Sequence, residues 1–153
     1  MDLRTVTELS PYGGTVHFNA DASNADLVRY VMQTARAAWP FIEWPKGIPR
    51  RDAARAIHEL ARRRVRYVRE DGDQLIRFPW RALEDGQGDC KTLSVFVASM
   101  ARAAGLPVRI RFVRYLGDDH FAHVYAVVDG IPVDPELSYG EEVTFESKMD
   151  RSL

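Results

Sequence analysis

The sequence contains very little cysteine: Cys90 is the only one among 153 residues. A lone cysteine has no partner within the chain, so no intramolecular disulfide supports the fold, and a reducing compartment is compatible with it. No stretch approaches the roughly 18 consecutive apolar residues of a membrane-spanning helix. The N-terminal sequence MDLRTVTELSPYGG also lacks the basic start, apolar stretch and small-residue cleavage site of a signal peptide. We therefore expect a protein without a membrane partner that is cytoplasmic, or delivered by a route that the sequence does not show.

The sequence also lacks an excess of charge of either sign. Lys and Arg together number 21 against 22 Asp and Glu, which gives a formal net charge of −1. This balance excludes a global attraction to nucleic acid or to an acidic membrane surface, so binding to either would need a local patch. The hydrophobic residues, at 46% of the chain, are sufficient for the core of one ordinary soluble domain.

Two segments have the apolar spacing of amphipathic helices, and a third is apolar almost all round. The first helix is expected over 24–38 and the second over about 50–66. The third opens at Cys90 and ends near Gly105, a residue typical of a helix C-terminus. Because a helix that is apolar on nearly every side must be buried, the third helix is predicted to be the central element of the domain.

The second helix and its C-terminal flank are crowded with arginine. One interpretation is a patch that binds phosphates, and the other is a solvated face whose arginines pair with Asp52, Glu59, Glu70 and Asp71. We favour the solvated face, because charge runs usually are solvated and the chain as a whole is not basic. The arginines are Arg50, Arg51, Arg55, Arg62, Arg63, Arg64, Arg66 and Arg69.

Residues typical of β-strands follow the third helix. The runs VRIRFVRY, HFAHVYAVV and IPVDP are rich in β-branched and aromatic residues, and Asp129-Gly130 between the last two is a strong hairpin signal. The preceding stretch 71–87 is expected to be a loop with a short strand at LIRF. The predicted class is α+β, with a central buried helix packed against an antiparallel sheet.

No internal repeat or domain boundary is visible, so a single domain is expected over 1–153. The first twenty residues are rich in turn-forming residues and include TVHFN, which could be an edge strand. The last residues contain few apolar side chains, so we expect a loosely held tail. The expected parts are an N-terminal arm (1–23), a helical part (24–70), a core (80–137) and the tail (138–153).

The predicted hairpin brings a histidine and a carboxylate together. With Asp-Gly at the turn, outward pairing sets Tyr125 opposite Asp134 and His123 opposite Glu136. His123, Tyr125 and Asp134 then share one face, with Asp134 the diagonal neighbour of His123. A carboxylate there can accept the imidazole N–H, fix its tautomer and hold the ring toward a nucleophile. A slip of one residue would place His123 and Asp134 on opposite faces.

Cys90 opens the third helix, with Asp89 as its expected N-cap and Gly88 allowing close approach of the backbone. The N-terminus of a helix places partial positive charge and free N–H groups beside the sulfur, which favours the nucleophilic thiolate and can hold an oxyanion. The alternative is that Cys90 is a small core residue, since free cysteine is commonly buried and inert.

Four motifs in this region resemble the transglutaminase-like core of the papain-like cysteine protease superfamily. They are Gly88-Asp89-Cys90 opening an Ala-rich helix, AAGLPVR at 103–109 closing it, His123 starting a strand, and Val133-Asp134-Pro135 on the next strand. The resemblance covers roughly 80–137 and implies a papain-like fold with a catalytic triad of Cys90, His123 and Asp134. The chain is also similar to small stand-alone members found in tailed-phage and prophage genomes, which implies association with a phage particle as an alternative to a cytoplasmic location.

Further site residues are less sharply defined. The backbone N–H of Cys90 is the expected oxyanion donor, with Gln87 and Trp80 as the nearest side-chain candidates before it and Gln74 as a more remote one. Tyr125 occupies the position of an aromatic that often follows the family's histidine, and is a candidate substrate contact. No cofactor is implied by the resemblance.

No metal site is expected. Four acidic and imidazole side chains between the first β-rich run and the start of the second resemble a ligand cluster, but residues three apart on a strand point to opposite faces. These residues are Asp118, Asp119, His120 and His123.

These features predict a thiol enzyme that acts on peptide or glutaminyl amides. Water as acceptor gives proteolysis or deamidation, and an amine gives transamidation; a cysteine peptidase is the first choice because no amine-binding feature is evident. The expected partner is a protein or peptide substrate, with the arginine-rich helix or the tail as a further protein contact. The alternative is a non-catalytic binding or assembly module of a phage-like particle or a multiprotein complex. Nucleic-acid binding is the weakest hypothesis.

Overall fold

The computed structural model describes residues 15–18, 23–69 and 74–153. Its helices are α2 (Asn24–Ala38), the 3₁₀ helix η1 (Trp39–Phe41), α3 (Arg50–Arg64), α4 (Pro79–Asp85) and α5 (Cys90–Ala103). Its strands are β1 (Thr15–Phe18), β2 (Arg66–Tyr67), β3 (Gln74–Arg77), β4 (Gln87–Gly88), β5 (Val108–Arg114), β6 (His123–Val128), β7 (Ile131–Val133) and β8 (Ser147–Ser152). None of the helices in these ranges is long and apolar enough to cross a membrane.

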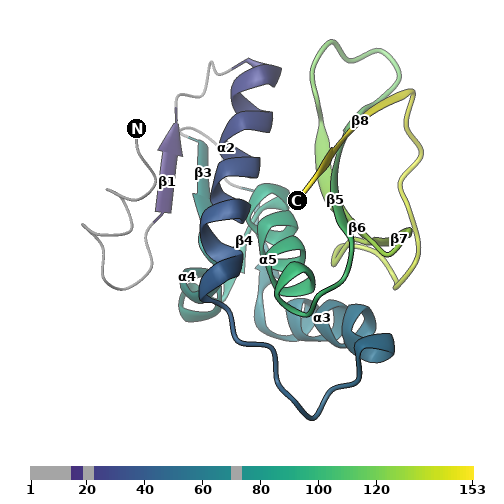
Figure 1. The fold of residues 1–153 in the computed structure, drawn as a ribbon. Coiled ribbons are helices and arrows are strands. Elements are labelled where there is room, and N and C mark those ends of the chain that lie inside the picture. Colours follow the sequence, from purple (N-terminus) through teal and green to yellow (C-terminus); the bar gives the residue numbers. More distant parts are fainter. Residues whose placement is uncertain (1–14, 19–22, 70–73) are drawn as a thin grey trace.

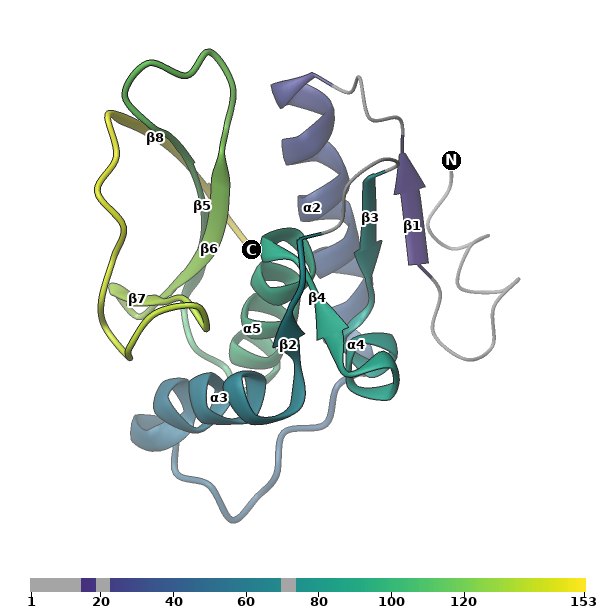
Figure 2. The same cartoon turned by 180° about the vertical axis from the view of Figure 1, so that it is seen from behind.

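The helix α5 is the centre of the fold (Figures 1 and 2). It contacts α2, α3, α4 and β3 on one side and the strands β5 and β6 on the other. Residues 91–99 of α5 are all buried, as the apolar composition of this segment predicted. The α+β class and the central buried helix packed against an antiparallel sheet are therefore confirmed.

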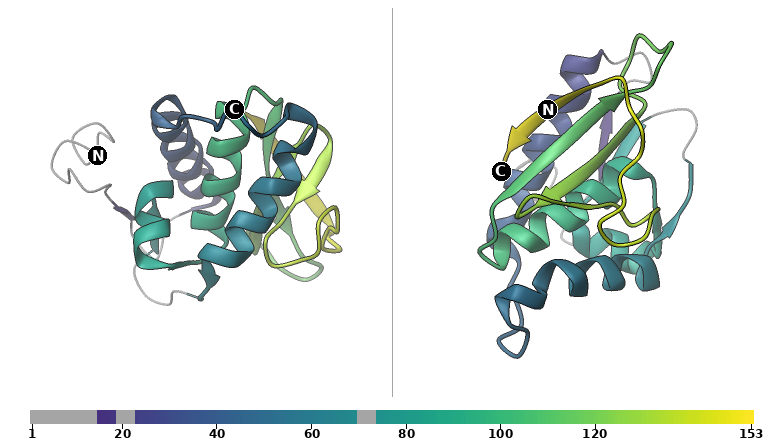
Figure 3. Two further views of the ribbon diagram at one scale, coloured as in Figure 1. Left: turned by 90° about the horizontal axis from the view of Figure 1, so that it is seen from below. Right: turned by 90° about the vertical axis from the view of Figure 1, so that its right-hand side faces the viewer.

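The main sheet has four antiparallel strands in the order β7-β6-β5-β8. The right-hand view of Figure 3 looks onto its outer face, and α5 lies behind it. Two smaller pairs accompany this sheet: β1 with β3, antiparallel, and β2 with β4, parallel. The strand β4 lies directly before α5 in the chain, so its pairing with β2 helps to fix the position at which α5 begins.

The predicted hairpin forms with the predicted register. Val128 pairs with Ile131 and Ala126 with Val133, so Asp129 and Gly130 are the two turn residues. Both have positive φ angles, 51° and 79°, as the tight turn between right-twisted strands requires. Continuing this register outward places Asp134 diagonal to His123.

The structure corrects two predictions. The stretch 71–87 was predicted as a loop with one strand, but besides β3 it contains α4, a short helix with Pro79 in its first turn and Gly86 as a left-handed C-cap. The tail was expected to be loosely held, but β8 pairs along the whole of β5. Its attachment is strengthened by Arg111, which makes a two-bond contact with Asp150 at 2.8 and 3.0 Å.

The other boundaries differ little from those predicted. The helix α2 has the predicted bounds and begins with a capping box between Ser23 and Asp26. The helix α3 ends at Arg64 instead of 66, because Arg66 joins β2 and pairs with Gln87. The strand expected within TVHFN is β1, and the rest of the predicted N-terminal arm lies outside the described residues.

Candidate active site

Cys90 is the first residue of α5 and Asp89 is its N-cap. The Asp89 carboxylate accepts hydrogen bonds from the backbone N–H groups of Lys91 at 3.0 Å and Thr92 at 3.4 Å. The N–H of Cys90 itself has no hydrogen-bond partner among the described residues. Of the first three N–H groups of the helix, the one that belongs to the cysteine is therefore available to an oxyanion.

A buried ion pair lies beside the cysteine. The ammonium of Lys91 binds the Asp89 carboxylate, and both side chains are buried. An unpaired carboxylate next to the sulfur would disfavour a thiolate, and the Lys91 ammonium compensates this charge. The pair therefore lets Asp89 cap the helix without opposing an anion at Cys90.

Gly88 allows the backbone to enter α5 at this point. A Cβ atom at position 88 would lie 2.5 Å from Cγ2 and 2.7 Å from Cβ of Thr92. The Thr92 side chain is held in place, since its hydroxyl accepts a hydrogen bond from the Arg77 N–H at 3.0 Å. Glycine is therefore the residue that fits at position 88, where the end of β4 lies against the first turn of α5.

His123 and Asp134 form a buried hydrogen-bonded pair. Nε2 of His123 lies 2.7 Å from Oδ2 of Asp134, and Oδ1 of the same carboxylate accepts the backbone N–H of Glu136 at 3.0 Å. Because an ionised carboxylate only accepts hydrogen bonds, Nε2 carries the proton, and Nδ1 is the nitrogen left for other partners. The predicted diagonal arrangement of these two side chains is present.

The electrostatics of His123 link it to Cys90. Burial by itself lowers the pKa of His123, but hydrogen bonds and charge interactions with Asp134 and Cys90 outweigh burial and raise the pKa to about 10. The imidazole is therefore protonated at neutral pH. Cys90, His123 and Asp134 thus form one coupled group, drawn from the start of α5, the start of β6 and the residue after β7.

Glu136 is a fourth ionisable group at this site. Its Oε2 lies 3.5 Å from Nδ1 of His123. Burial raises the pKa of Glu136, and the charge of His123 opposes this shift. Sequence analysis placed Glu136 opposite His123 across the hairpin but assigned it no role.

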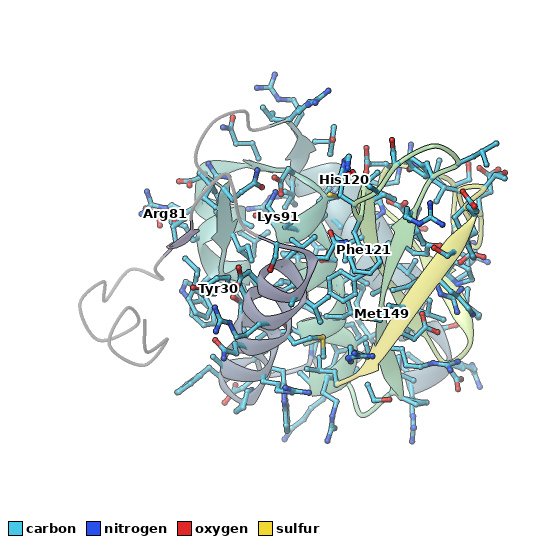
Figure 4. The ribbon with its side chains drawn as sticks, turned by 90° about the horizontal axis from the view of Figure 1, so that it is seen from above. Tyr30, Arg81, Lys91, His120, Phe121 and Met149 are labelled. Atoms are coloured by element: carbon cyan, nitrogen blue, oxygen red, sulfur yellow. The ribbon has the colours of Figure 1, made fainter. Side chains whose placement is uncertain are left out.

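A pocket of about 480 Å³ opens at Cys90 and His123. Cys90 is partly exposed and lines this pocket. Lys91, His120 and Phe121, which are labelled in Figure 4, also line it, together with Tyr67. The lining comes from α2, the β2–β4 region, α5 and the loop before β6, so the site lies where the helices meet the sheet.

Of the four side chains proposed from sequence as oxyanion or substrate contacts, Gln74 in β3 lines this pocket, and the other three do not. Trp80 stacks on Phe78 in α4, with ring centroids 5.0 Å apart. Gln87 lies in β4, paired with Arg66. Tyr125 is buried, and its hydroxyl donates to Glu142 at 2.6 Å.

Tyr67 is a pocket residue that sequence reasoning missed. Burial, together with the negative charges of Glu136, Cys90 and Asp89, raises the pKa of its phenol to about 12. The hydroxyl therefore keeps its proton and remains a hydrogen-bond donor at neutral pH. The alternation in RRVRYV hints at a strand, but the parallel pairing of Tyr67 with Gly88, which brings the phenol to the site, has no sequence signal.

Among the described residues, one group has the composition of a metal site: His123, Asp134 and Glu136, whose ligand atoms lie within 4.8 Å of one another. Two ligands of a tetrahedral zinc ion would be about 3.3 Å apart, given bonds of about 2.0–2.1 Å. The 2.7 Å between Nε2 and Asp134 Oδ2 is instead a hydrogen-bond distance. The residues Asp118, Asp119, His120 and His123 do not form such a group in the part of the chain that the structure describes.

Comparison with known proteins identifies one family. The family model described as the transglutaminase-like superfamily matches residues 43–135. The match extends from the segment before α3 through the hairpin, and it includes Cys90, His123 and Asp134. Neither the curated proteins nor the solved structures searched gave a significant match.

Proposed function

Because the chain belongs to the transglutaminase-like superfamily, we propose that it is a cysteine-dependent enzyme that transfers an acyl group from a peptide or glutaminyl amide. Cys90 is the nucleophile, His123 the general acid and base, and Asp134 the residue that orients His123. The observation that carries this proposal is the 2.7 Å contact between Asp134 and Nε2 of His123, whose imidazole also interacts with Cys90.

The first half-reaction forms a thioester. The Cys90 thiolate attacks the amide carbon, and the carbonyl oxygen becomes an oxyanion. When the C–N bond breaks, the protonated Nδ1 of His123 gives its proton to the leaving nitrogen. The products are an acyl-enzyme and a neutral amine, or ammonia when the substrate is a glutamine side chain.

The second half-reaction releases the acyl group. A water molecule or an amine attacks the thioester, His123 accepts a proton from it, and the Cys90 thiolate departs. His123 is then an imidazolium again beside a thiolate, which restores the starting state.

Two donors are available for the oxyanion. One is the backbone N–H of Cys90, which has no partner among the described residues. The other is the protonated phenol of Tyr67, which lines the same pocket. Donors aimed at the charge that develops in the transition state are a major source of catalysis in acyl transfer.

Hydrolysis is favoured over transamidation because the pocket lining offers little to bind an amine. A primary amine acceptor is a cation at neutral pH, and the one carboxylate among the described lining residues, Asp89, is already paired with Lys91. Water needs no such partner, so the acyl-enzyme is expected to be hydrolysed.

The direct test is the rate of Cys90 alkylation by iodoacetamide between pH 4 and 9, in the wild type and in His123→Ala. A His-paired thiolate reacts rapidly well below pH 8.5, the usual pKa of a thiol, and the substitution slows that reaction. A slow reaction that rises only near pH 8.5 and is unaffected by the substitution contradicts the proposal and favours a non-catalytic binding module.

A second test identifies the acceptor. The protein is incubated with glutamine-containing peptides, with and without putrescine, and the products are analysed by mass spectrometry. Peptide fragments indicate proteolysis, a gain of about 1 Da indicates deamidation, and a putrescine adduct indicates transamidation. Cys90→Ala, which lacks the nucleophile, is the control and should give none of these products.

A further inference from the structure

A second pocket, of about 290 Å³, adjoins the one that contains Cys90. Tyr67 lines both pockets, so its side chain stands between them. Pro135, which directly follows Asp134, forms part of the wall of the second pocket. A peptide bound with its amide at Cys90 advances at most about 3.6 Å per residue, so residues a few positions away can reach this second pocket.

Four arginines are among the residues that line the second pocket. Arg62, Arg63 and Arg64 come from the last turn of α3, and Arg66 comes from β2. No carboxylate is among its lining residues in the described parts of the chain. We call it the arginine pocket.

The charge of the arginine pocket is not neutralised within the described residues. None of its four arginines forms an ion pair there, and Arg62 donates instead to the carbonyl oxygen of Leu137 at 2.6 Å. Of the pairings expected from sequence for the arginine-rich helix, the described residues contain Arg51 with Asp52 at 4.0 Å, while Glu70 and Asp71 lie outside them.

Several arginines elsewhere in the described residues are paired with carboxylates. Arg77 and Arg81 both bind Asp85, at 2.8 and 3.0 Å, and Arg111 binds Asp150. Exposed arginines without an ion pair among the described residues also occur elsewhere, at Arg36 and Arg50, but the four of the arginine pocket border a pocket that shares Tyr67 with the candidate active site.

Helix stability accounts for only part of this pattern. Cations in the last turn of a helix interact favourably with its dipole, which explains a basic residue at the end of α3. That effect does not require Arg66, which lies beyond the helix in β2. It also does not require the four side chains to border the same pocket as Pro135.

We propose that the arginine pocket binds a carboxylate of the peptide substrate, so that the enzyme prefers an acidic group a few residues from the reacting amide. The proposal rests on the proposed function. A guanidinium presents a planar fork of N–H donors that matches a carboxylate, and two of them can hold one carboxylate from both sides. A pocket of this volume fits one side chain or chain end, which favours a peptide carboxylate over a nucleic-acid backbone.

The carboxylate has two sources, an Asp or Glu side chain or the C-terminal α-carboxylate. The probes are fluorogenic octapeptides of Ala, Leu and Gln, in which Glu replaces the residue at one position at a time. One set has an amidated C-terminus and the other a free carboxylate. If kcat/KM rises for only one Glu position in the amidated set, the pocket binds a side-chain carboxylate. If kcat/KM rises only when the C-terminus is free, the pocket binds the C-terminal carboxylate.

The matched variants remove equal charge at two places. Arg63→Gln/Arg64→Gln/Arg66→Gln removes three exposed arginines of the pocket, and Arg36→Gln/Arg50→Gln/Arg51→Gln removes three exposed arginines that do not line it. We expect the best carboxylate-bearing peptide to exceed its neutral counterpart in kcat/KM by about tenfold in the wild type. This ratio falls toward one in the pocket variant and persists in the control variant.

Binding to Cys90→Ala, measured by fluorescence anisotropy with the same peptides, separates this proposal from the proposed function. If neutral peptides are turned over and a carboxylate gives no increase in kcat/KM, the proposal for the arginine pocket is wrong, whereas the proposed enzymatic function is supported. A gain that survives in the pocket variant overturns the arginine pocket as well. If no peptide is turned over but binding depends on the carboxylate and is lost in the pocket variant, the proposal for the arginine pocket is supported and the proposed enzymatic function is contradicted.

Discussion

His58 donates a hydrogen bond from Nε2 to the carbonyl oxygen of Leu137 at 2.8 Å, although the two residues are 79 positions apart in the chain. The guanidinium of Arg62 donates to the same oxygen. Leu137 in turn donates its N–H to the carbonyl of Asp134 at 2.9 Å, closing the turn after that residue. The helix α3 thereby holds the segment that carries the proposed orienting carboxylate.

Removing this contact should therefore affect stability and catalysis together. His58 is buried, and His58→Leu leaves the Leu137 carbonyl with one donor fewer, at a cost of about 1–3 kcal/mol in the free energy of unfolding. We expect kcat to fall while KM changes little, because the turn positions Asp134. The measurements are urea unfolding and steady-state kinetics. His58→Gln, which retains an N–H donor, should restore part of both; equal loss in the two variants would contradict a positioning role.

Asp134→Asn tests the orientation of the imidazole. The amide presents a donor or a neutral acceptor to Nε2 in place of the carboxylate, so the proton on Nε2 and the charge on the ring are no longer favoured. We expect kcat to fall on the order of a thousandfold or more, with the circular dichroism spectrum unchanged. A variant with more than a tenth of the wild-type rate would remove Asp134 from the mechanism.

Tyr67→Phe tests the second oxyanion donor. The substitution removes only the hydroxyl and retains the ring between the two pockets. Loss of one such donor lowers kcat by about a hundredfold or more, whereas the rate of Cys90 alkylation should change little, because alkylation by iodoacetamide forms no oxyanion. Tyr30→Phe is the control, because Tyr30 lies in α2 and does not line the pocket. Equal kcat in the two variants would exclude Tyr67 as a donor.

The pKa of His123 predicts how stability depends on pH. It is about 10 in the folded chain and about 6.5 in an unfolded one, so folding favours the protonated imidazole. The resulting stabilisation is fully present below pH 6.5 and is lost as pH rises toward 10. The difference in free energy of unfolding between the wild type and His123→Gln should therefore shrink from pH 6 to pH 10. A difference that is constant or grows with pH would mean that the imidazole is not held protonated.

Gly88→Ala should disturb the start of α5. The added methyl meets Thr92, which is buried and hydrogen-bonded and so has little freedom to move. We expect a loss of about 1–3 kcal/mol in urea unfolding and slower alkylation of Cys90. Gly47→Ala is the matched control, since a Cβ there has no neighbour within 4 Å, and its effect should stay within about 0.5 kcal/mol. Equal stability of the two variants would contradict the close approach at Gly88.

The sequence predicts those parts of the site that depend on local pattern. The apolar spacing identifies α2 and α5, and the Asp129-Gly130 turn fixes a register that sets His123 diagonal to Asp134. The segments that were missed depend on distant partners. The strand β8 is a polar edge strand defined by its pairing with β5, and α4 is only seven residues long.

The same limit applies to the arginines and to Tyr67. Composition reveals how many arginines lie near the second helix, but only the fold separates Arg63, Arg64 and Arg66, which border a pocket, from Arg50 and Arg51, which do not. Tyr67 reaches the site through a parallel pairing of two residues, which is too short to leave a pattern. Long-range pairing therefore decides which of several chemically equivalent side chains are placed to act.

The proposed catalytic residues are divided between α5 and the sheet, and this division determines how substitutions in the core can change activity. The sulfur moves with the helix, whereas the imidazole and its carboxylate move with the hairpin. Apolar contacts between the helix and the sheet, such as those of the fully buried Val97 and Ala126, set the distance between α5 and the hairpin. Conservative exchanges in the core, which leave every polar side chain intact, can thus shift the reacting atoms by fractions of an ångström and change turnover by an order of magnitude or more.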